Sequence, residues 1–495
     1  MDETSKATHT TQTTAELFSA DMHMFHITGF PQQSGVLTRK MEAPRGARLE
    51  VWRISSASER HIPGPGADGV EFSTECFSLI NSGNRTLGAP KRSWKVTLDD
   101  GAVHLAGMTC INLKSMYNDP SQMREALAWR LFRQAGVPAA RHTYAKLAFD
   151  ATYYGLFSVI EQVDKRFLKD HFGDNHRGNL YKAYCGDVGC ATLEHRTGPD
   201  GDDSGRQYYT AAADRTYRLK TNEDDPGAST YDDLAQFIRT INGTGIKGGD
   251  ERFGTDAFRE SVDGIMNARA FLRWAAVNLL LGSWDNYYAT PSNYYLYNSG
   301  HQGAEHEFMD APYFTFIPWD YDNCLGIDYF GTKWQYTDIV DWPGNTRHYW
   351  REHATSRIPL VQNLLRNQDY RQYYLDYLEF LLDTEFNPDA FSRQIAADSG
   401  DGLWGRVGQA AYLESATPYG QPFTGRQFTN DEVYWSGCEQ NELRHGEEKA
   451  EGIVHYVRMR RDSAREQLEK LRKETPRTAG PASFPAVVEP LPPRG

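Results

Sequence analysis

Two short segments constrain the fold of this chain more than any other feature of its sequence. The first reads Gly-Ser-Trp-Asp-Asn-Tyr, ends an apolar helical run and contains Asp285. The second reads Ile-Pro-Trp-Asp-Tyr-Asp, follows a strand-like run and contains Asp320 and Asp322. Asn293 lies between them, directly before the strand-like residues 294–297. The predicted order is therefore a buried helix, a loop with a carboxylate, an asparagine, a hairpin and a second loop with carboxylates.

Phosphoryl transfer on a kinase-like framework requires side chains in this order. Asp285 can accept a hydrogen bond from a substrate hydroxyl and orient it for in-line attack. Asn293, Asp320 and Asp322 offer the oxygen ligands that Mg²⁺ takes. Each residue also has a structural explanation, because an Asp often caps a turn and Asp-x-Asp occurs in solvated turns. The regularly spaced oxygens of a Ca²⁺ loop are absent, so the combination favours a site for magnesium and a nucleotide.

The residues before this region have the plan of a small nucleotide-binding lobe. Apolar alternation predicts three strands, a helix that Gly136 ends and two more strands, whereas the chain after Gln162 is mostly helical. The expected fold class is α+β, as a bilobal atypical protein-kinase-like fold with a small β-rich N-lobe and a larger helical C-lobe. The predicted strands cover residues 75–80, 93–98, 110–114, 142–149 and 155–162, and the predicted helices cover 123–135, 232–241, 262–281, 357–382, 386–397 and 449–473.

Composition divides the chain into five segments. A Thr-rich polar start is expected to be disordered, and a Pro-rich end is expected to be extended and flexible. An acidic stretch with two cysteines interrupts the helical part as an insertion. The predicted segments are a disordered N-terminus at 1–20, an N-terminal β extension at 21–70, the N-lobe at 71–165, the C-lobe at 166–475 with the insertion near 184–216, and the tail at 476–495.

A glycine-containing loop between the first two N-lobe strands is the candidate phosphate loop. Backbone N–H groups of Gly83, Asn84 and Arg85 can cover phosphate oxygens there, although a plain hairpin loop has a similar composition. Glu161 ends the strand that leads into the helical part. We therefore treat Glu161 as a candidate contact for adenine or ribose.

Several lysines compete for the contact with the phosphates. Kinases position the phosphates with a lysine that a helix glutamate holds. Lys114 ends the third strand and precedes the helix that carries Glu125, which fits this pair. Lys95 lies inside the preceding strand and is an equal alternative. Lys182 is a further candidate near the predicted cleft.

Composition and missing motifs argue against several other classes of protein. The net charge of −13, from 53 basic and 66 acidic residues, disfavours nucleic-acid binding, which needs Lys and Arg to neutralise phosphates. The apolar run of about 18 residues that a membrane span needs is absent, and the polar start is unlike a signal peptide. Six scattered cysteines predict reduced thiols and a cytoplasmic location. The sequence contains no zinc-ligand pattern, hydrolase elbow or P-loop signature.

Several motifs keep one order along the chain. They lie at residues 83–85, 90–95, 113–121, 155–164, 178–182, 219–222, 284–285, 293–297 and 318–322. In this order they resemble the CotH spore-coat protein kinases, an atypical branch of the protein-kinase-like fold. The resemblance covers residues 75–330, with a weaker match to about residue 470.

The resemblance implies phosphorylation of Ser or Thr in a protein or peptide substrate, with ATP and Mg²⁺, or Mn²⁺ in its place. By position, Asp285 corresponds to the catalytic-loop aspartate and Asn293 to a metal ligand. Asp320 corresponds to the metal-binding aspartate, and Asp322 is an alternative or second ligand. The phosphate loop departs from the family pattern, because it lacks a leading Arg and contains Arg85. The alternatives are a nucleotide-binding pseudokinase or scaffold, a small-molecule kinase and an enzyme that transfers AMP.

Overall fold

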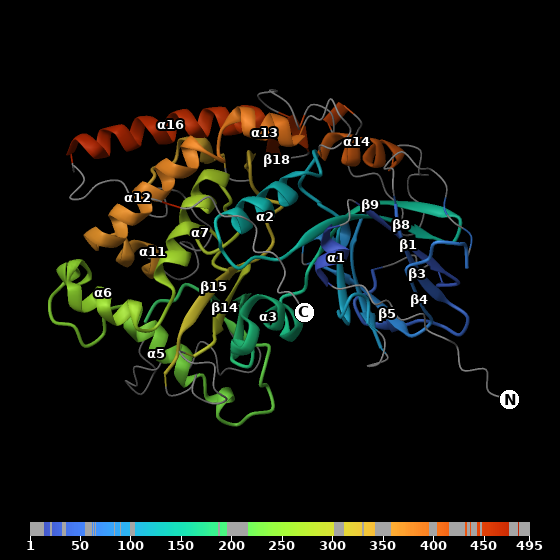
Figure 1. Ribbon diagram of the computed structural model, residues 1–495, viewed down its shortest axis with the longest axis horizontal. Helices are drawn as coiled ribbons and strands as arrows, with labels where there is room; N and C mark the ends of the chain where they lie inside the picture. Colours follow the sequence, from blue (N-terminus) through green and yellow to red (C-terminus); the bar gives the residue numbers. More distant parts are fainter. Residues whose placement is uncertain are drawn as a thin grey trace.

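The computed structural model is a mixed α+β protein with one large sheet, a smaller sheet and a set of helices (Figure 1). The α+β fold class expected from the sequence is confirmed. The structure describes residues 14–19, 22–31, 36–54, 62, 64, 66–83, 85–89, 91–99, 104–186, 189–195, 216–300, 311–328, 331–341, 358–395, 403–414, 431–432, 436, 443–445, 448–474 and 484.

The large sheet has nine strands in the order β2-β5-β6-β7-β9-β8-β1-β3-β4. Its neighbours are antiparallel except β1 and β8, which run parallel. The strands are β1 (Met22–Thr28), β2 (Met41–Glu42), β3 (Arg48–Arg53), β4 (Phe72–Thr74), β5 (Phe77–Ser82), β6 (Ser93–Leu98), β7 (Cys110–Lys114), β8 (His142–Phe149) and β9 (Thr152–Ile160).

Alternation of side chains explains how this sheet forms its core. In β6, Trp94, Val96 and Leu98 are buried, whereas the intervening Lys95 and Thr97 are half-buried. Successive residues of a strand point to opposite faces, so this pattern gives the strand one apolar face. The buried side chains of this face pack into a cluster that extends from β1 to β9.

A second sheet lies among the helices and has the order β13-β10-β14-β15. Helix α7 packs against it, and most of that helix is buried, as its apolar circumference predicts. The strands of this sheet are β10 (Asn179–Ala183), β13 (Tyr217–Leu219), β14 (Tyr294–Asn298) and β15 (Phe314–Pro318). Two further small sheets pair β11 (Cys185–Gly186) with β12 (Gly189–Cys190), and β18 (Glu448–Ala450) with both β16 (Ile327–Asp328) and β17 (Leu443–His445).

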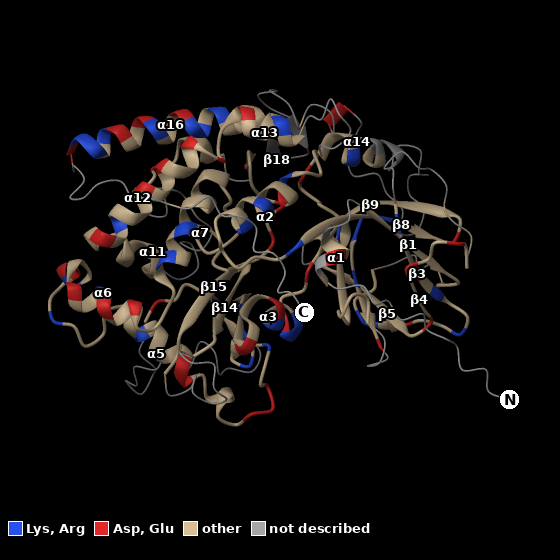
Figure 2. Cartoon of the chain, viewed as in Figure 1, with Lys and Arg blue, Asp and Glu red and all other residues tan. Residues whose placement is uncertain are grey.

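The helices lie between the strands and after them, and their exposed faces carry both signs of charge. Figure 2 shows acidic and basic residues mixed along the α16 ribbon. The described helices are α1 (Thr14–Ser19), α2 (Arg124–Gln134), α3 (Lys165–Phe172), α5 (Asp232–Ile241), α6 (Asp256–Asp263), α7 (Ala268–Leu281), α11 (Pro359–Leu364), α12 (Gln368–Asp383), α13 (Pro388–Ile395), α14 (Leu403–Glu414) and α16 (Ile453–Glu474).

Both ends of the chain contain ordered anchors. Residues 14–19 form α1, whose Leu17 is fully buried, while residues 1–13 of the expected disordered start lie outside the described residues. Phe484, in the Pro-rich tail, packs on Tyr373 and Tyr377 of α12 with ring centroids 5.5 and 5.0 Å apart. Apolar side chains therefore hold parts of segments that composition alone marks as flexible.

Two further features differ from the sequence-based expectations. Strands β1–β4 belong to the same sheet as the predicted N-lobe, so the sheet continues across the expected boundary near residue 70. The prediction of reduced thiols is wrong for Cys185 and Cys190, which form a disulfide because the β11–β12 register places them opposite each other. Within the described residues, no helix is long and apolar enough to cross a bilayer.

Candidate active site

The site is built where the last residue of β7 meets the loop after β15. The Nζ of Lys114 lies 3.0 Å from Oδ1 of Asp320. Both Asp320, at φ +61°, and Asn293, at φ +53°, have left-handed backbone conformations. The backbone N–H of Trp319 donates to the carbonyl oxygen of Asn293 at 3.0 Å. The two predicted segments therefore lie side by side in space.

The structure distinguishes between the two competing lysines. Lys114 pairs with a carboxylate of the site, whereas Lys95, on β6, lies beside Cys110 of β7. Burial opposes charge on Lys114, but attraction to Asp320 and Glu125 outweighs burial and raises the pKa of Lys114. Lys114 is therefore the cation closest to the carboxylates.

Helix α2 brings Glu125 to the same place. Its Oε1 accepts a long hydrogen bond, 3.5 Å, from the backbone N–H of Tyr321. The expected Lys114–Glu125 ion pair does not form, because Asp320 occupies that position beside the ammonium. Burial, and then repulsion from Asp320, raise the pKa of Glu125 to about 7.

Asp285 is held by side chains that the sequence did not single out. Thr290 Oγ1 donates to its Oδ1 at 2.6 Å, and Asn323 Nδ2 donates to its Oδ2 at 3.2 Å. Asn118 Nδ2 donates to Asn323 Oδ1 at 2.7 Å, which continues the chain of contacts toward α2. Asn323 directly follows Asp322, so its position next to the Asp-x-Asp pair is the sequence feature that could have identified it as a site residue.

Asn293 connects the two carboxylate loops. Its Nδ2 donates to the backbone carbonyl of Asp285 at 2.8 Å. The Oδ1 atom is the part of this amide that can bind a cation. The role of Asn293 as a metal ligand stays a prediction, and its Nδ2 contact leaves Oδ1 as the atom that would bind the ion.

The site carries more negative than positive charge. Burial, and then repulsion from Asp320 and Glu125, raise the pKa of Asp322 well above its ordinary value. Among the described residues, no three acidic, His or Cys side chains converge closely enough to hold a metal alone. Mg²⁺ commonly uses one or two carboxylates together with substrate phosphates. The donor set of Asp320, Asp322 and Asn293 fits that mode of binding.

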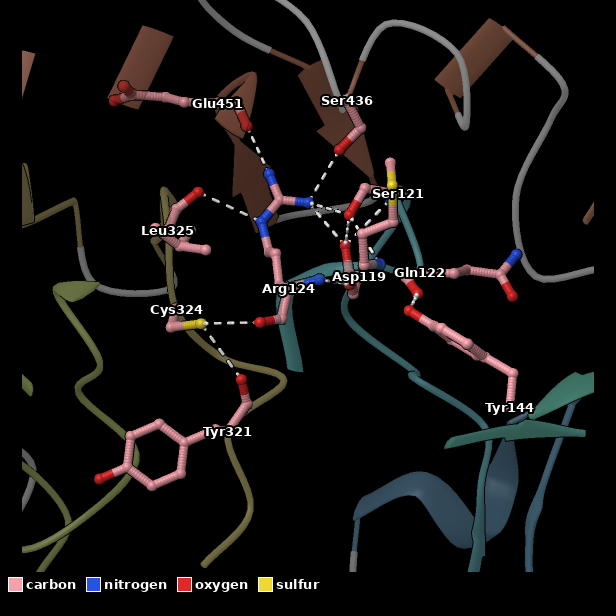
Figure 3. A network of polar contacts seen from close by, with 11 residues as sticks. Asp119, Ser121, Gln122, Arg124, Tyr144, Tyr321, Cys324, Leu325, Ser436 and Glu451 are labelled. Atoms are coloured by element: carbon pink, nitrogen blue, oxygen red, sulfur yellow. Dashed lines mark hydrogen bonds and ion pairs between the residues drawn. The ribbon is translucent and has the colours of Figure 1, made fainter. Parts of the chain in front are cut away.

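A buried arginine joins the elements around the site (Figure 3). Arg124 NH1 lies 2.6 Å from Asp119 Oδ1 and donates to Ser436 Oγ at 2.8 Å. Its Nε donates to the carbonyl of Leu325 at 3.2 Å, and NH2 donates to the carbonyl of Glu451. The guanidinium thus ties the start of α2 to the loop that carries Asp320.

The remaining predicted contacts have different positions. Gly83 has φ +113°, and a Cβ there would collide with the Thr86 hydroxyl, so the turn requires glycine. Asn84 lies outside the described residues, and Arg85 begins the short helix η1 (Arg85–Gly88). No described contact joins these loop residues to the carboxylates.

Glu161 is held by partners outside this site. Its Oε2 accepts from Arg141 Nε at 3.0 Å and lies 3.1 Å from His171 Nε2. The carboxylate also accepts from the backbone N–H of Arg141 at 3.0 Å. These contacts occupy the group that was expected to meet adenine or ribose.

Comparisons with known proteins agree with the motif order. A family model described as "CotH kinase protein" matches residues 81–400. Invasin CotH2 of Rhizopus delemar is 21% identical over 333 residues, which are 66% of this chain and 49% of the relative. Inner spore coat protein H of Bacillus subtilis is 24% identical over 289 residues, which are 58% of this chain and 66% of that protein. The chain spans about half the length of the Rhizopus relatives it matches.

Proposed function

The chain belongs to the CotH family, and from this premise and the carboxylate site we propose that it is an ATP- and Mg²⁺-dependent phosphotransferase acting on Ser or Thr of a protein or peptide. The proposal includes a kinase-like bilobal arrangement, in which the large sheet and α2 form one lobe and the helices with the small sheet form the other. The observation that carries it is the Lys114–Asp320 pair, which joins β7 to the loop after β15.

Asp285 would act on the acceptor. Hydrogen bonds from Thr290 and Asn323 fix both of its oxygens, so the carboxylate is oriented before a substrate arrives. It would accept the proton of the attacking hydroxyl as the bond to the γ-phosphorus of ATP forms and ADP leaves. Fixed geometry of this kind lowers the entropic cost of reaching the transition state.

The other carboxylates would bind the metal–nucleotide. Bound Mg²⁺ neutralises charge that develops on the phosphates. Asp320, Asp322 and the Asn293 amide oxygen are the residues that would hold the ion, and Lys114 would contact the phosphates. Because Lys114 already pairs with Asp320, one acid would serve both the lysine and the metal, as the excess of carboxylates allows.

The reaction is tested with ATP labelled at either the γ- or the α-phosphate. Incubation with Mg²⁺ and a basic protein substrate should transfer the γ label to Ser or Thr, since an acidic enzyme surface favours a basic acceptor. Transfer of the α label would instead identify an AMP transferase. Stabilisation by ATP without any transfer would identify a nucleotide-binding scaffold. Transfer of the γ label to an added small-molecule hydroxyl compound, but not to protein, would identify a small-molecule kinase.

A further inference from the structure

Lys182 lies beside the Lys114–Asp320 pair but is not part of it. Strand β10 places its Nζ 5.7 Å from the centroid of the Tyr295 ring and 6.0 Å from that of Trp319. The Nζ of Lys114 lies 5.7 Å from the centroid of the same Trp319 ring. Two lysines from different sheets therefore share one indole.

The two lysines differ in their ionic partners. Lys114 has the Asp320 carboxylate at 3.0 Å. Lys182 makes ring contacts only, with no ion pair or hydrogen bond to any residue that the structure describes. Burial, and then repulsion from Lys114, lower the pKa of Lys182 to about 8. The aromatic rings hold this half-buried ammonium in place, and among the described residues Asp320 attracts it without forming an ion pair.

Further cations surround Lys182. Lys220 follows β13 directly, and Lys95 lies on β6 of the large sheet; both repel the Lys182 ammonium, while Asp320 attracts it. Lys220 is exposed, and it also interacts with Glu223 and Arg218. The positive charge therefore extends from the buried Lys182 to an exposed rim.

The site thus separates its charges into two groups. The carboxylates of Asp320, Asp322 and Glu125 lie close enough to repel one another beside α2 and the loop after β15. Lysines gather beside β10, β13 and β6. A ligand that carries a cation at one end and an anionic chain at the other complements both groups, and a metal-bound polyphosphate has that distribution of charge.

We propose that Lys182, with Lys220 at the rim, binds non-bridging oxygens of the nucleotide's polyphosphate chain at a position separate from Lys114. This inference rests on the proposed function and adds to it a reason for selecting triphosphates over monophosphates. An AMP molecule lacks the oxygens that this position contacts, whereas ATP and inorganic tripolyphosphate possess them. Contacts with the Tyr295 and Trp319 rings hold the Lys182 ammonium beside the Lys114–Asp320 pair, where it would meet the polyphosphate chain.

The test is calorimetric titration of wild-type protein, Lys182→Met and Lys182→Arg with ATP, AMP and tripolyphosphate in the presence of Mg²⁺. Methionine keeps an unbranched stem for the two rings but removes the charge. Charge-assisted hydrogen bonds predict an affinity loss of about tenfold to a hundredfold for ATP and tripolyphosphate. AMP affinity should stay within about twofold, and arginine should recover most of the ATP affinity. Lys220→Met should have a smaller effect, because its side chain is exposed.

Lys247→Met, an exposed lysine outside the site, is the matched control and should bind like wild type. Melting temperatures of all variants identify any loss that comes from misfolding. The inference is overturned if Lys182→Met binds ATP as wild type does, or if its affinities for ATP and AMP fall equally. If ATP binds as inferred but no label is transferred, the proposed catalysis fails and the phosphate contact stands. If the wild type binds no nucleotide, both fail.

Discussion

Two glutamates near the junction of the large sheet and the helices occupy opposite electrostatic environments. Glu161 is buried among Arg141 and His171; burial opposes its charge, but the hydrogen bonds from these side chains lower its pKa to about 2. Glu125 is buried beside other carboxylates, and its pKa rises to about 7. Glu161 has hydrogen bonds from both cations, whereas Glu125 has only the attraction of nearby Lys114, which burial and repulsion from Asp320 outweigh.

The contrast distinguishes charged side chains that stabilise the fold from charged side chains that would bind a ligand. A buried carboxylate with hydrogen-bonded cations stabilises the fold, and one without them destabilises it unless a ligand supplies the missing charge. Arg124 and Asp119, which are fully buried and paired at 2.6 Å, belong with Glu161. Glu125 and Asp322 belong to the other class, and Asp320, which Lys114 contacts, lies beside them. We therefore propose that the metal–nucleotide binds at Asp320 and Asp322.

The largest expected effect is on turnover, at the carboxylate site that contains Asp285. Asp285→Ala removes the group that would accept the hydroxyl proton, so phosphotransfer should fall by about a hundredfold to ten-thousandfold. ATP affinity should remain within a few-fold, because Asp285 faces the acceptor. Initial rates of γ-label transfer and ATP titration measure the two quantities. Asp256→Ala, an exposed aspartate on α6, is the control, and undiminished transfer by Asp285→Ala would refute its role.

At Glu161, whose charge is paired with Arg141 and His171, the corresponding change should lower the free energy of unfolding. Glu161→Gln leaves the mostly buried Arg141 guanidinium without its main partner, since Asp170 is then the carboxylate that still pairs with it among the described residues. Removing one member of a buried pair costs about 3 kcal/mol. Urea unfolding should show this loss, while the rate per folded molecule stays near that of wild type. A lower rate at full stability would place Glu161 in the nucleotide site after all.

A smaller effect is expected for the amide that orients Asp285. Asn323→Ala removes a hydrogen bond to Asp285 and one from Asn118. Loss of one orienting hydrogen bond corresponds to about 1.5 kcal/mol, or roughly tenfold in rate. We expect this loss in kcat with KM nearly unchanged. A change confined to KM would instead place Asn323 in substrate binding.

The smallest expected effect is the pH dependence of stability, and it has opposite signs in the two regions. Glu125 has a raised folded pKa, so its contribution is greatest below its unfolded pKa of about 4.3 and is lost as the pH rises through about 7. Glu161 has a lowered folded pKa, so its contribution is present above about pH 4.3 and lost as the pH falls toward 2.

Thermal melts without metal or nucleotide test this difference. Between about pH 5 and 8, the contribution of Glu125 should lower the melting temperature of the wild type by a few degrees. Glu125→Gln should lack that component, because glutamine does not titrate, whereas Glu161→Gln should retain it. Equal slopes for the wild type and Glu125→Gln would contradict the assignment.

Local patterns made much of the architecture predictable. The apolar circumference of α7 and the alternation in β6 follow from side-chain period. Strand β6 formed over the predicted residues 93–98, whereas the helix predicted at 262–281 is interrupted, because α6 ends at Asp263 and α7 begins at Ala268. The order of Asp285, Asn293 and Asp320 indicated one site because a hairpin brings neighbouring loops together. Contacts between distant segments carry no such local signal.

The unpredicted features depend on those distant segments. Asp320 pairs with Lys114 because β7 and the loop after β15 lie close together. No local pattern in the sequence predicts the distance between these two segments. The Arg124 contacts with Ser436 and Glu451 join segments far apart along the chain. The disulfide became visible only through the β11–β12 register, because two nearby cysteines are equally compatible with free thiols.

One measurement tests most directly whether Asp320 and the carboxylates beside it hold a metal–nucleotide. ATP is titrated into wild-type protein and into Asp320→Asn, each with and without Mg²⁺, with Asp256→Asn as control. The account predicts that Mg²⁺ strengthens ATP binding to the wild type and to the control by at least about tenfold, and that Asp320→Asn loses this dependence. Equal Mg²⁺ dependence in Asp320→Asn and the wild type would contradict the account.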